Sequence, residues 1–142
     1  MDLIPEDAHK LFGNGRYDAF PLIASRGDIV LAVWRSATKQ DIDHDNFLRG
    51  AMSADGGRTW NAPFVLYDDK DPLIEIGNGG VAWDEKRNVW VVMFLTEHYD
   101  SVSSTTVARR GAHTITSPLV ATGSSWSKPS PELPVSAAAW WY

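Results

Sequence analysis

Runs of apolar residues, separated by polar and glycine-containing segments, divide the chain into short strands. Residues 29–34 and 89–95 are near-continuous apolar runs rich in β-branched and aromatic side chains, which is typical of strands buried on both faces. Polar segments at 25–28, 36–46, 68–80 and 84–88 predict turns and loops. The pattern therefore predicts an all-β fold, with further strands at residues 20–24, 47–52, 64–67, 80–83, 104–109 and 113–116.

The two ends of the chain depart from this pattern. Residues 5–12 predict one short helix, because Pro5 suits a first helical position and two acidic residues follow at the positive end of the helix dipole. Residues 131–142 form an apolar tail that ends in Trp-Trp-Tyr. Such a tail is expected to begin a further strand or to dock, because it would promote aggregation if left in water.

A weak internal repeat relates the two halves of the strand-rich region. The segment GRTWNAP at 57–63 is echoed by GSSWSKP at 123–129, although Ala121 stands in the second copy where the first has Asp55. Repetition of four-stranded units is the sequence signature of a β-propeller. Within one domain spanning 1–142, we therefore expect a first unit over 16–67, a second over 77–130, and the tail over 131–142.

The composition narrows the range of partners. The net charge of −5, without basic ribbons interleaved with aromatic residues, argues against nucleic acid and against anionic membrane surfaces. No stretch approaches the roughly 20 apolar residues that span a bilayer. The first ten residues lack the basic and then apolar pattern of a secretory signal, which leaves the compartment open. The chain has no cysteine, so it forms neither a disulfide nor a Cys-based zinc site.

The most specific motif is SADGGRTW at residues 53–60. Ser53 and Asp55 are expected to accept hydrogen bonds from backbone N–H groups within a tight turn. Gly57 and the glycine before it permit the positive φ that the turn needs. Trp60 is expected to fold over the hairpin and bury a large apolar area. These roles are structural, and they imply neither proton transfer nor a nucleophile.

This motif resembles the Asp-box, S-x-D-x-G-x-T-W, of the sialidase (neuraminidase) superfamily, also called the BNR repeat, and it matches at every defining position, Thr59 included. Residues 16–67 resemble the opening blade of such enzymes, and residues 77–95 resemble the start of their second blade. The resemblance implies sialidase-like β-propeller blades, about two four-stranded antiparallel sheets. A propeller typically needs about four to eight blades to close, so the ring is incomplete unless the chain is oligomeric or part of a longer protein.

The resemblance also implies a site for sialic acid. Sialidases bind the substrate carboxylate with three arginines, and they use an Asp as acid/base and a Tyr–Glu pair as nucleophile, which is an exception to the two-carboxylate scheme of other glycosidases. Arg35 resembles an active-site arginine of that triad. Ala19 stands where the first triad arginine is expected, and Arg16 lies nearby but out of register.

Asp43 resembles the acid/base residue, and Asp41 and Asp45 compete for that role because the length of this loop varies. An acid in the loop would need a pKa raised by burial to donate a proton near neutrality, and the alternative is a solvated acidic loop. The alternating acids also suggest a calcium loop. However, Asn46 and Met52 stand where an EF-hand needs Gly and Glu. No metal and no cofactor are therefore expected.

Two functions of different classes stay open. The first is an exo-α-sialidase or a related glycoside hydrolase, which is complete only when the other blades are supplied. The second is a non-catalytic module that binds sialic acid or another glycan, or serves as a structural part of a homo-oligomer or larger assembly. Ala19 at the arginine position favours the second for the chain alone. So does the lack of a Tyr–Glu pair, since Glu97 and Tyr99 have no matching sequence context.

Overall fold

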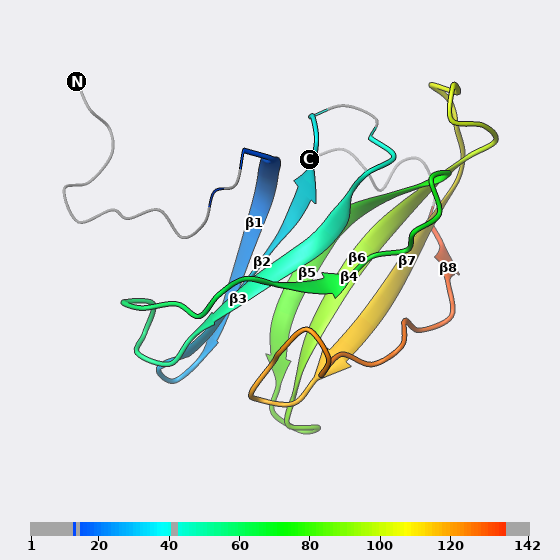
Figure 1. Cartoon of the computed structure of the whole chain (residues 1–142). Helices are drawn as coiled ribbons and strands as arrows, with labels where there is room; N and C mark the ends of the chain where they lie inside the picture. Colours follow the sequence, from blue (N-terminus) through cyan, green and yellow to red (C-terminus); the bar gives the residue numbers. More distant parts are fainter. Residues whose placement is uncertain (1–12, 14, 41–42, 136–142) are drawn as a thin grey trace, which may run out of the picture.

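The computed structural model describes residues 13, 15–40 and 43–135, which fold into two antiparallel β-sheets (Figure 1). None of these residues lies in a helix, so the predicted all-β class is confirmed, and no helix among them could cross a membrane. The helix predicted at 5–12 lies outside the described residues. Each sheet has four strands in sequence order: β1 (Tyr17–Arg26), β2 (Ile29–Ala37), β3 (Phe47–Ser53) and β4 (Phe64–Tyr67), then β5 (Ile74–Asp84), β6 (Val89–Tyr99), β7 (Val107–Ser117) and β8 (Leu133–Pro134).

Strand pairing in the second sheet extends beyond the bounds that the sequence predicts. The predicted loop at 68–80 already contains the beginning of β5, where Ile76 pairs with Thr96 of β6. The segments 104–109 and 113–116, predicted as two strands, belong to the single strand β7. Glycines within β5 and β7 weaken the local strand signal. Pairing of both strands with β6 overrides it, because strand preference depends mainly on cross-strand packing.

The short strand β8 begins inside the predicted tail and is held by backbone pairing and by side-chain contacts. Its residues 133–134 pair with residues 111–112 of β7. Just before it, Glu132 Oε2 lies 2.8 Å from His98 Nε2 and 3.4 Å from His113 Nε2. These contacts fasten the returning chain to the face of the second sheet. Residues 136–142 of the tail lie outside the described residues.

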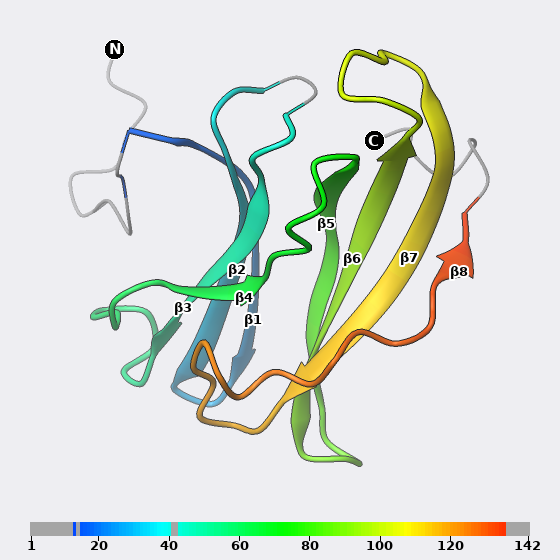
Figure 2. The same cartoon turned by 45° about the vertical axis from the view of Figure 1, so that its right-hand side comes forward.

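The two sheets pack face to face (Figure 2). Their facing side chains form the main core. Leu31 and Val33 of β2 meet Trp90, Val92 and Phe94 of β6, and all five side chains are fully buried. Strand β5 contacts β1, β2 and β3. The first strands of the two sheets, β1 and β5, therefore lie side by side. The same packing shields the polar residues near this junction from water.

The connections after β3 and after β7 share a hydrogen-bond pattern. The backbone N–H of Asn61 donates to Met52 O at 2.9 Å, and Asn61 Oδ1 accepts from the Met52 N–H at 2.7 Å. Ser127 repeats this arrangement with Thr116, at 2.8 Å through its N–H and 3.0 Å through its Oγ. Asn61 and Ser127 each follow the tryptophan of the repeated sequence segment. The repeated sequence segment therefore corresponds to a repeated pair of hydrogen bonds, which closes each connection.

Candidate functional site

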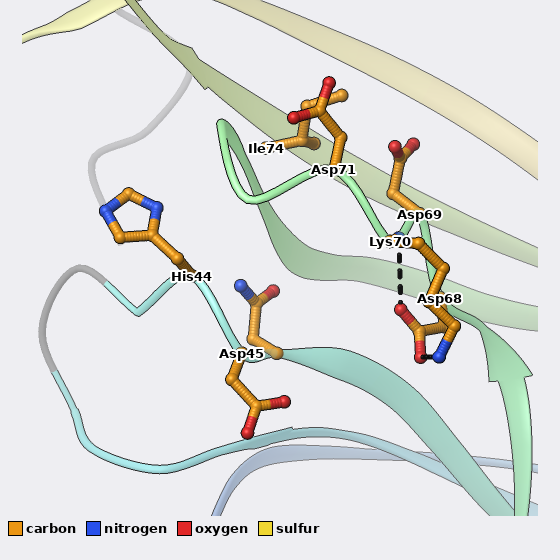
Figure 3. A pocket seen from close by; sticks show the side chains of 8 residues that line it. His44, Asp45, Asp68, Asp69, Lys70, Asp71 and Ile74 are labelled. Carbon is orange, nitrogen blue, oxygen red and sulfur yellow. Dashed lines mark hydrogen bonds and ion pairs between the residues drawn. The ribbon is translucent and has the colours of Figure 1, made fainter. Parts of the chain in front are cut away.

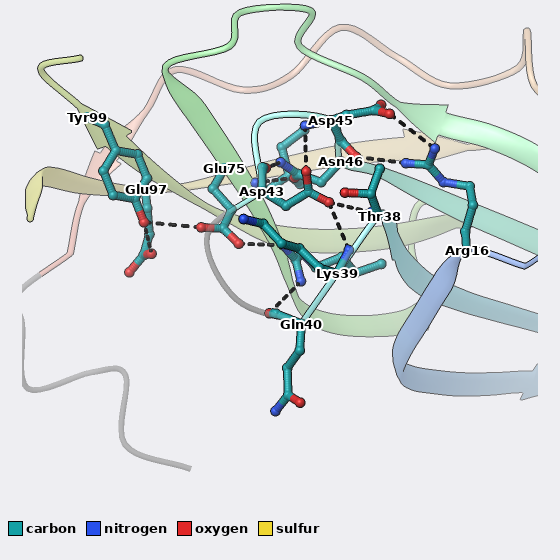
Figure 4. Close-up of polar contacts among 12 residues, drawn as sticks. Arg16, Thr38, Lys39, Gln40, Asp43, Asp45, Asn46, Glu75, Glu97 and Tyr99 are labelled. Atoms are coloured by element: carbon teal, nitrogen blue, oxygen red, sulfur yellow. Dashed lines mark hydrogen bonds and ion pairs between the residues drawn. The ribbon is translucent and has the colours of Figure 1, made fainter. Parts of the chain in front are cut away.

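A cluster of charged side chains lies where β2 meets β5 and β6 (Figure 4). Arg35 is only 3% exposed, and its guanidinium donates through Nη2 to Glu75 Oε1 and through Nη1 to the Gln40 carbonyl oxygen at 3.4 Å. A buried arginine needs such partners, because an unpaired charge in the interior is strongly destabilising. The pair therefore ties the first sheet to the second.

Tyr99 stands between two carboxylates at the same place. Its hydroxyl lies 3.1 Å from Glu75 Oε2 and 3.0 Å from Glu97 Oε2, and Glu97 also accepts from Arg110 Nε at 2.8 Å. The hydroxyl has one proton and can donate to only one of the two carboxylates at a time. Burial raises the pKa of Glu75, and the charge of Arg35 offsets this only in part. The Tyr99 hydroxyl therefore bridges the carboxylates of the two strands.

A pocket of about 150 Å³ opens beside this cluster. Phe20 lines it with an aromatic side chain that is 58% exposed and a φ of 56°. The β1–β2 pairing shifts register between Ala19 and Leu22, which marks a bulge at this point. A bulge can re-aim a side chain, and a left-handed conformation is unusual for a bulky residue, so the backbone here is strained where the pocket forms. The pocket is lined by Phe20, Arg35, Gln40, Glu75, Ile76, Gly77 and Glu97.

Asp43, the predicted acid/base residue, closes the loop after β2. Its carboxylate accepts from the backbone N–H groups of Thr38, of Lys39 at 3.2 Å and of Asp45 at 3.0 Å. Burial would raise the pKa of Asp43, but these backbone donors outweigh burial and lower the pKa. An ionised carboxylate of this kind does not donate a proton near neutrality, so its contacts support a structural role. The competing Asp41 lies outside the described residues.

Arg16 lies apart from Arg35. Its guanidinium contacts Asp45 Oδ2 at 3.2 Å and Ser36 Oγ at 3.2 Å, and it sits over the ring of Phe47. Ser36 and Arg35 are adjacent in β2, so their side chains point to opposite faces of the sheet. The structure therefore does not bring the two predicted substrate-binding arginines together, and Figure 4 shows Arg16 beyond the Asp43 loop, away from Glu75.

The Asp-box forms the hydrogen-bonded turn that its sequence predicts. Ser53 Oγ donates to Asp55 Oδ1 at 2.7 Å and accepts from the Gly57 N–H at 2.8 Å. Asp55 accepts from the Thr59 N–H at 2.8 Å and from Thr59 Oγ1 at 2.6 Å. Trp60 Nε1 donates to the Gly57 carbonyl oxygen at 2.9 Å, and Gly57 has a φ of 91°. The polar side chains of Ser53, Asp55, Thr59 and Trp60 thus serve the turn, while the Gly56 N–H donates to the Asp28 carbonyl oxygen of the β1–β2 turn at 2.8 Å.

The side chains of the Asp-box therefore contribute to the hairpin and not to the pocket. The hydrogen bonds from the Thr59 side chain and backbone, with that from Ser53, lower the pKa of Asp55 to about 2. Trp60 packs against Ala32, Trp34 and Ala51, on the face of the first sheet that is turned away from the second. None of the box residues lines the pocket beside Arg35.

A second, more acidic hollow of about 190 Å³ lies between the loop before β3 and the loop after β4 (Figure 3). Asp68, Asp69 and Asp71 line it with His44. All three acids are already engaged: Asp68 by Lys70, Asp69 by the Tyr67 hydroxyl, and Asp71 by the Leu73 N–H at 2.9 Å. Within the described part of the chain, no group of three or more histidine and acidic side chains is placed to hold a metal ion.

Sequence reasoning missed several members of the charged cluster. Glu75 lies in a stretch that the sequence predicts as a loop, and Phe20 gives no polar signal at all. Glu97 and Tyr99 share one face of β6, and Glu75 pairs with Glu97 across the sheet. The spacing of Glu97 and Tyr99 was visible in sequence, but the partner strand that completes the cluster was not. Asn46 was also missed as an anchor: it is buried, and its Oδ1 accepts from the Ile76 N–H at 2.6 Å.

Comparison with protein families and with curated proteins gives no match for this chain. The fold and the site define it as an all-β protein with two packed antiparallel sheets and a mixed-charge pocket near their junction.

Proposed function

We propose that this chain is a two-blade unit of a sialidase-like β-propeller, which binds a glycan and does not hydrolyse it as an isolated chain. The Asp-box turn after β3 and the repeated closure after β7 support the assignment to this kind of blade. The observation that carries glycan binding is the pocket in which Phe20 faces the polar groups of Arg35, Glu75 and Glu97.

The lining of this pocket suits a sugar. Carboxylate oxygens of Glu75 and Glu97 can accept hydrogen bonds from sugar hydroxyls, and charge-assisted hydrogen bonds are stronger than neutral ones. The exposed ring of Phe20 offers an apolar surface for the C–H face of a sugar ring. Binding sites for small polar ligands commonly combine an apolar wall with a few placed polar groups.

The protonation states of the candidate groups argue against hydrolysis by the chain alone. Asp43 has a lowered pKa and is bound by backbone donors, so it is a poor general acid. Burial, together with the charges of Glu97 and Glu75, raises the pKa of Tyr99, which disfavours the ionised nucleophile. The favoured role of the pocket is therefore binding.

An alternative is an exo-α-sialidase or a related glycoside hydrolase that becomes complete when further blades close the ring. One observation favours it. Tyr99 contacts two carboxylates, and one of them, Glu75, has a raised pKa of the kind that general acids need. Two sheets of this kind do not close a ring, so further copies of the chain or further blades would have to surround the pocket.

Glycan binding is tested by replacing Phe20, with Ile23→Ala as the matched control. Both side chains are exposed and both lie on β1, but only Phe20 lines the pocket. Phe20→Ala should weaken binding of simple methyl glycosides about ten-fold, measured by chemical-shift titration, because it removes the apolar wall. The thermal midpoint of the variant is measured alongside, so that a loss of binding is compared at equal stability.

The control Ile23→Ala should bind as the wild type does. A panel of neutral and acidic methyl glycosides that shifts no resonance of the wild-type protein would refute glycan binding. Hydrolysis of a fluorogenic sialoside by the isolated chain, abolished by Asp43→Ala or Tyr99→Phe, would favour the hydrolase alternative.

A further inference from the structure

Among the residues that the structure describes, Arg35 is the only arginine that lines the pocket, and its guanidinium is already paired with a carboxylate. Arg35 gives one arm to Glu75 and the other to the Gln40 carbonyl oxygen, and both acceptors also line the pocket. Because Arg35 is only 3% exposed, a ligand carboxylate that bound its guanidinium would compete with Glu75 and would have to displace it at least in part. That would leave Glu75, with a side chain only 13% exposed, as a buried carboxylate without its cation.

The remaining charges of the pocket also oppose an anion. Of the residues that the structure describes, the charged ones that line it are Arg35, Glu75 and Glu97. Asp43 lies close enough to raise the pKa of Glu75 by charge repulsion. Arg110 offsets part of this charge, but it is bound to Glu97 and does not line the pocket. A second carboxylate brought in by a ligand would meet like charges at short range.

We infer that the pocket selects an uncharged sugar over a sialic acid, because Glu75 occupies the position on Arg35 that a sugar carboxylate would need. This inference rests on the proposed glycan-binding function and specifies its ligand. Sugar hydroxyls can donate to Glu75 and Glu97 without breaking the ion pair with Arg35. Phe20 then provides the face against which the ring packs.

Selectivity is tested on the wild-type protein with two ligands that differ by a single charge. The probes are the methyl α-glycoside of N-acetylneuraminic acid and the methyl ester of the same glycoside, with neutral methyl glycosides of hexoses in parallel. Chemical-shift titration gives the Kd of each. The ester or a neutral hexoside should bind at least about ten-fold tighter than the acid, since a charge-assisted hydrogen bond is gained only at the expense of an existing one.

The variant Glu75→Gln sharpens the test. The amide keeps an oxygen for Arg35 and has nearly the same shape, but it leaves the guanidinium charge free for a ligand carboxylate. This variant should gain about ten-fold in affinity for the acid and show no such gain for the ester. Glu85→Gln removes the same charge from an exposed turn and is the matched control for a long-range effect. It should leave both affinities unchanged.

Tighter binding of the acid than of the ester and of all neutral glycosides by the wild-type protein would overturn the inference and leave glycan binding intact. Equal gains in Glu75→Gln and Glu85→Gln would also overturn it, since the effect would then be a general one of net charge. If the wild-type protein binds no sugar of either class, the proposed function itself fails. The comparison of acid and ester on the wild-type protein stands even if Glu75→Gln does not fold.

Discussion

At the scale of single residues, the Arg35–Glu75 pair is the part of the site where a single substitution is expected to change the stability most. The Arg35 side chain is 4% exposed and the Glu75 side chain 13%, so neither charge is well solvated. The net contribution of such a pair to stability is small, because desolvation offsets attraction. Removal of only one partner is strongly destabilising, since the other charge then stays buried without compensation.

We therefore expect Arg35→Ala to destabilise the protein by about 3–5 kcal/mol in urea unfolding. The double variant Arg35→Met/Glu75→Leu should recover most of that loss, because it removes both charges and fills the space with apolar groups. Arg87→Ala, which breaks an exposed contact with Asp84, is the control and should cost far less. A double variant as unstable as Arg35→Ala would show that the pair is not the source of the effect.

At the scale of secondary-structure elements, the two connections after β3 and β7 differ in most residues of the box, the aspartate among them. The first has Asp55, which accepts from Thr59, and its Trp60 Nε1 donates to Gly57 O. The second has Ala121 in place of the aspartate, and Trp126 Nε1 is buried without a partner among the described residues. The polar groups of the first hairpin thus have more of their hydrogen bonds formed. Its aspartate makes the stability of this hairpin sensitive to acid.

We expect the Asp-box to lose its contribution to stability at low pH. The pKa of Asp55 is about 2 in the folded protein against 3.8 without these contacts, so the folded state favours the ionised form. That contribution is complete above pH 3.8 and is lost as the pH falls towards 2. In urea unfolding at a series of pH values, Asp55→Asn should flatten this acid limb. Asp100→Asn, at an exposed position after β6, is the control, and an equal effect there would contradict the assignment to Asp55.

At the scale of the whole molecule, the second sheet has a face, on the side turned away from the first, that no strand among the described residues covers. Met93 is 40% exposed there, and its cross-strand neighbours are Gly80 and Thr114. Val91 and Leu95 share this face and are half-buried. A further blade of a propeller would pack against such a face, and in our proposal a second copy of the chain can supply it.

We therefore expect the protein to associate at micromolar concentration, measured by sedimentation velocity. Met93→Glu should shift the population to monomer, because it places a charge in the centre of the open apolar face. Val102→Glu, at an exposed position in the β6–β7 connection, is the control and should associate as the wild type does. A wild-type protein that sediments as a monomer would refute the homo-oligomer, and the missing blades would then have to come from a longer chain.

Local sequence was sufficient to locate the strands of the first sheet and the Asp-box, although β1 extends beyond the predicted 20–24 on both sides and β2 continues to Ala37, into the predicted loop. The run at 29–34 predicts β2 because near-continuous apolar residues suit a strand buried on both faces, and the structure confirms that burial. Ser53, Asp55 and Thr59 form the predicted turn because each hydrogen bond spans at most four residues. Local sequence was not sufficient for β5 and β7, where pairing with β6 decides the bounds.

The tertiary structure alone decided what surrounds the candidate site. Arg35, Glu75 and Tyr99 come from β2, β5 and β6, and their contact depends on sheet register and on how the sheets pack. The pKa of Asp43 is lowered because the loop aims backbone N–H groups at it, which no residue pattern specifies. The sequence by itself determined the all-β class and the Asp-box turn, because strand periodicity and turn chemistry act over a few residues. Packing decided which charges become partners, because these residues are far apart in sequence and only the fold brings them together.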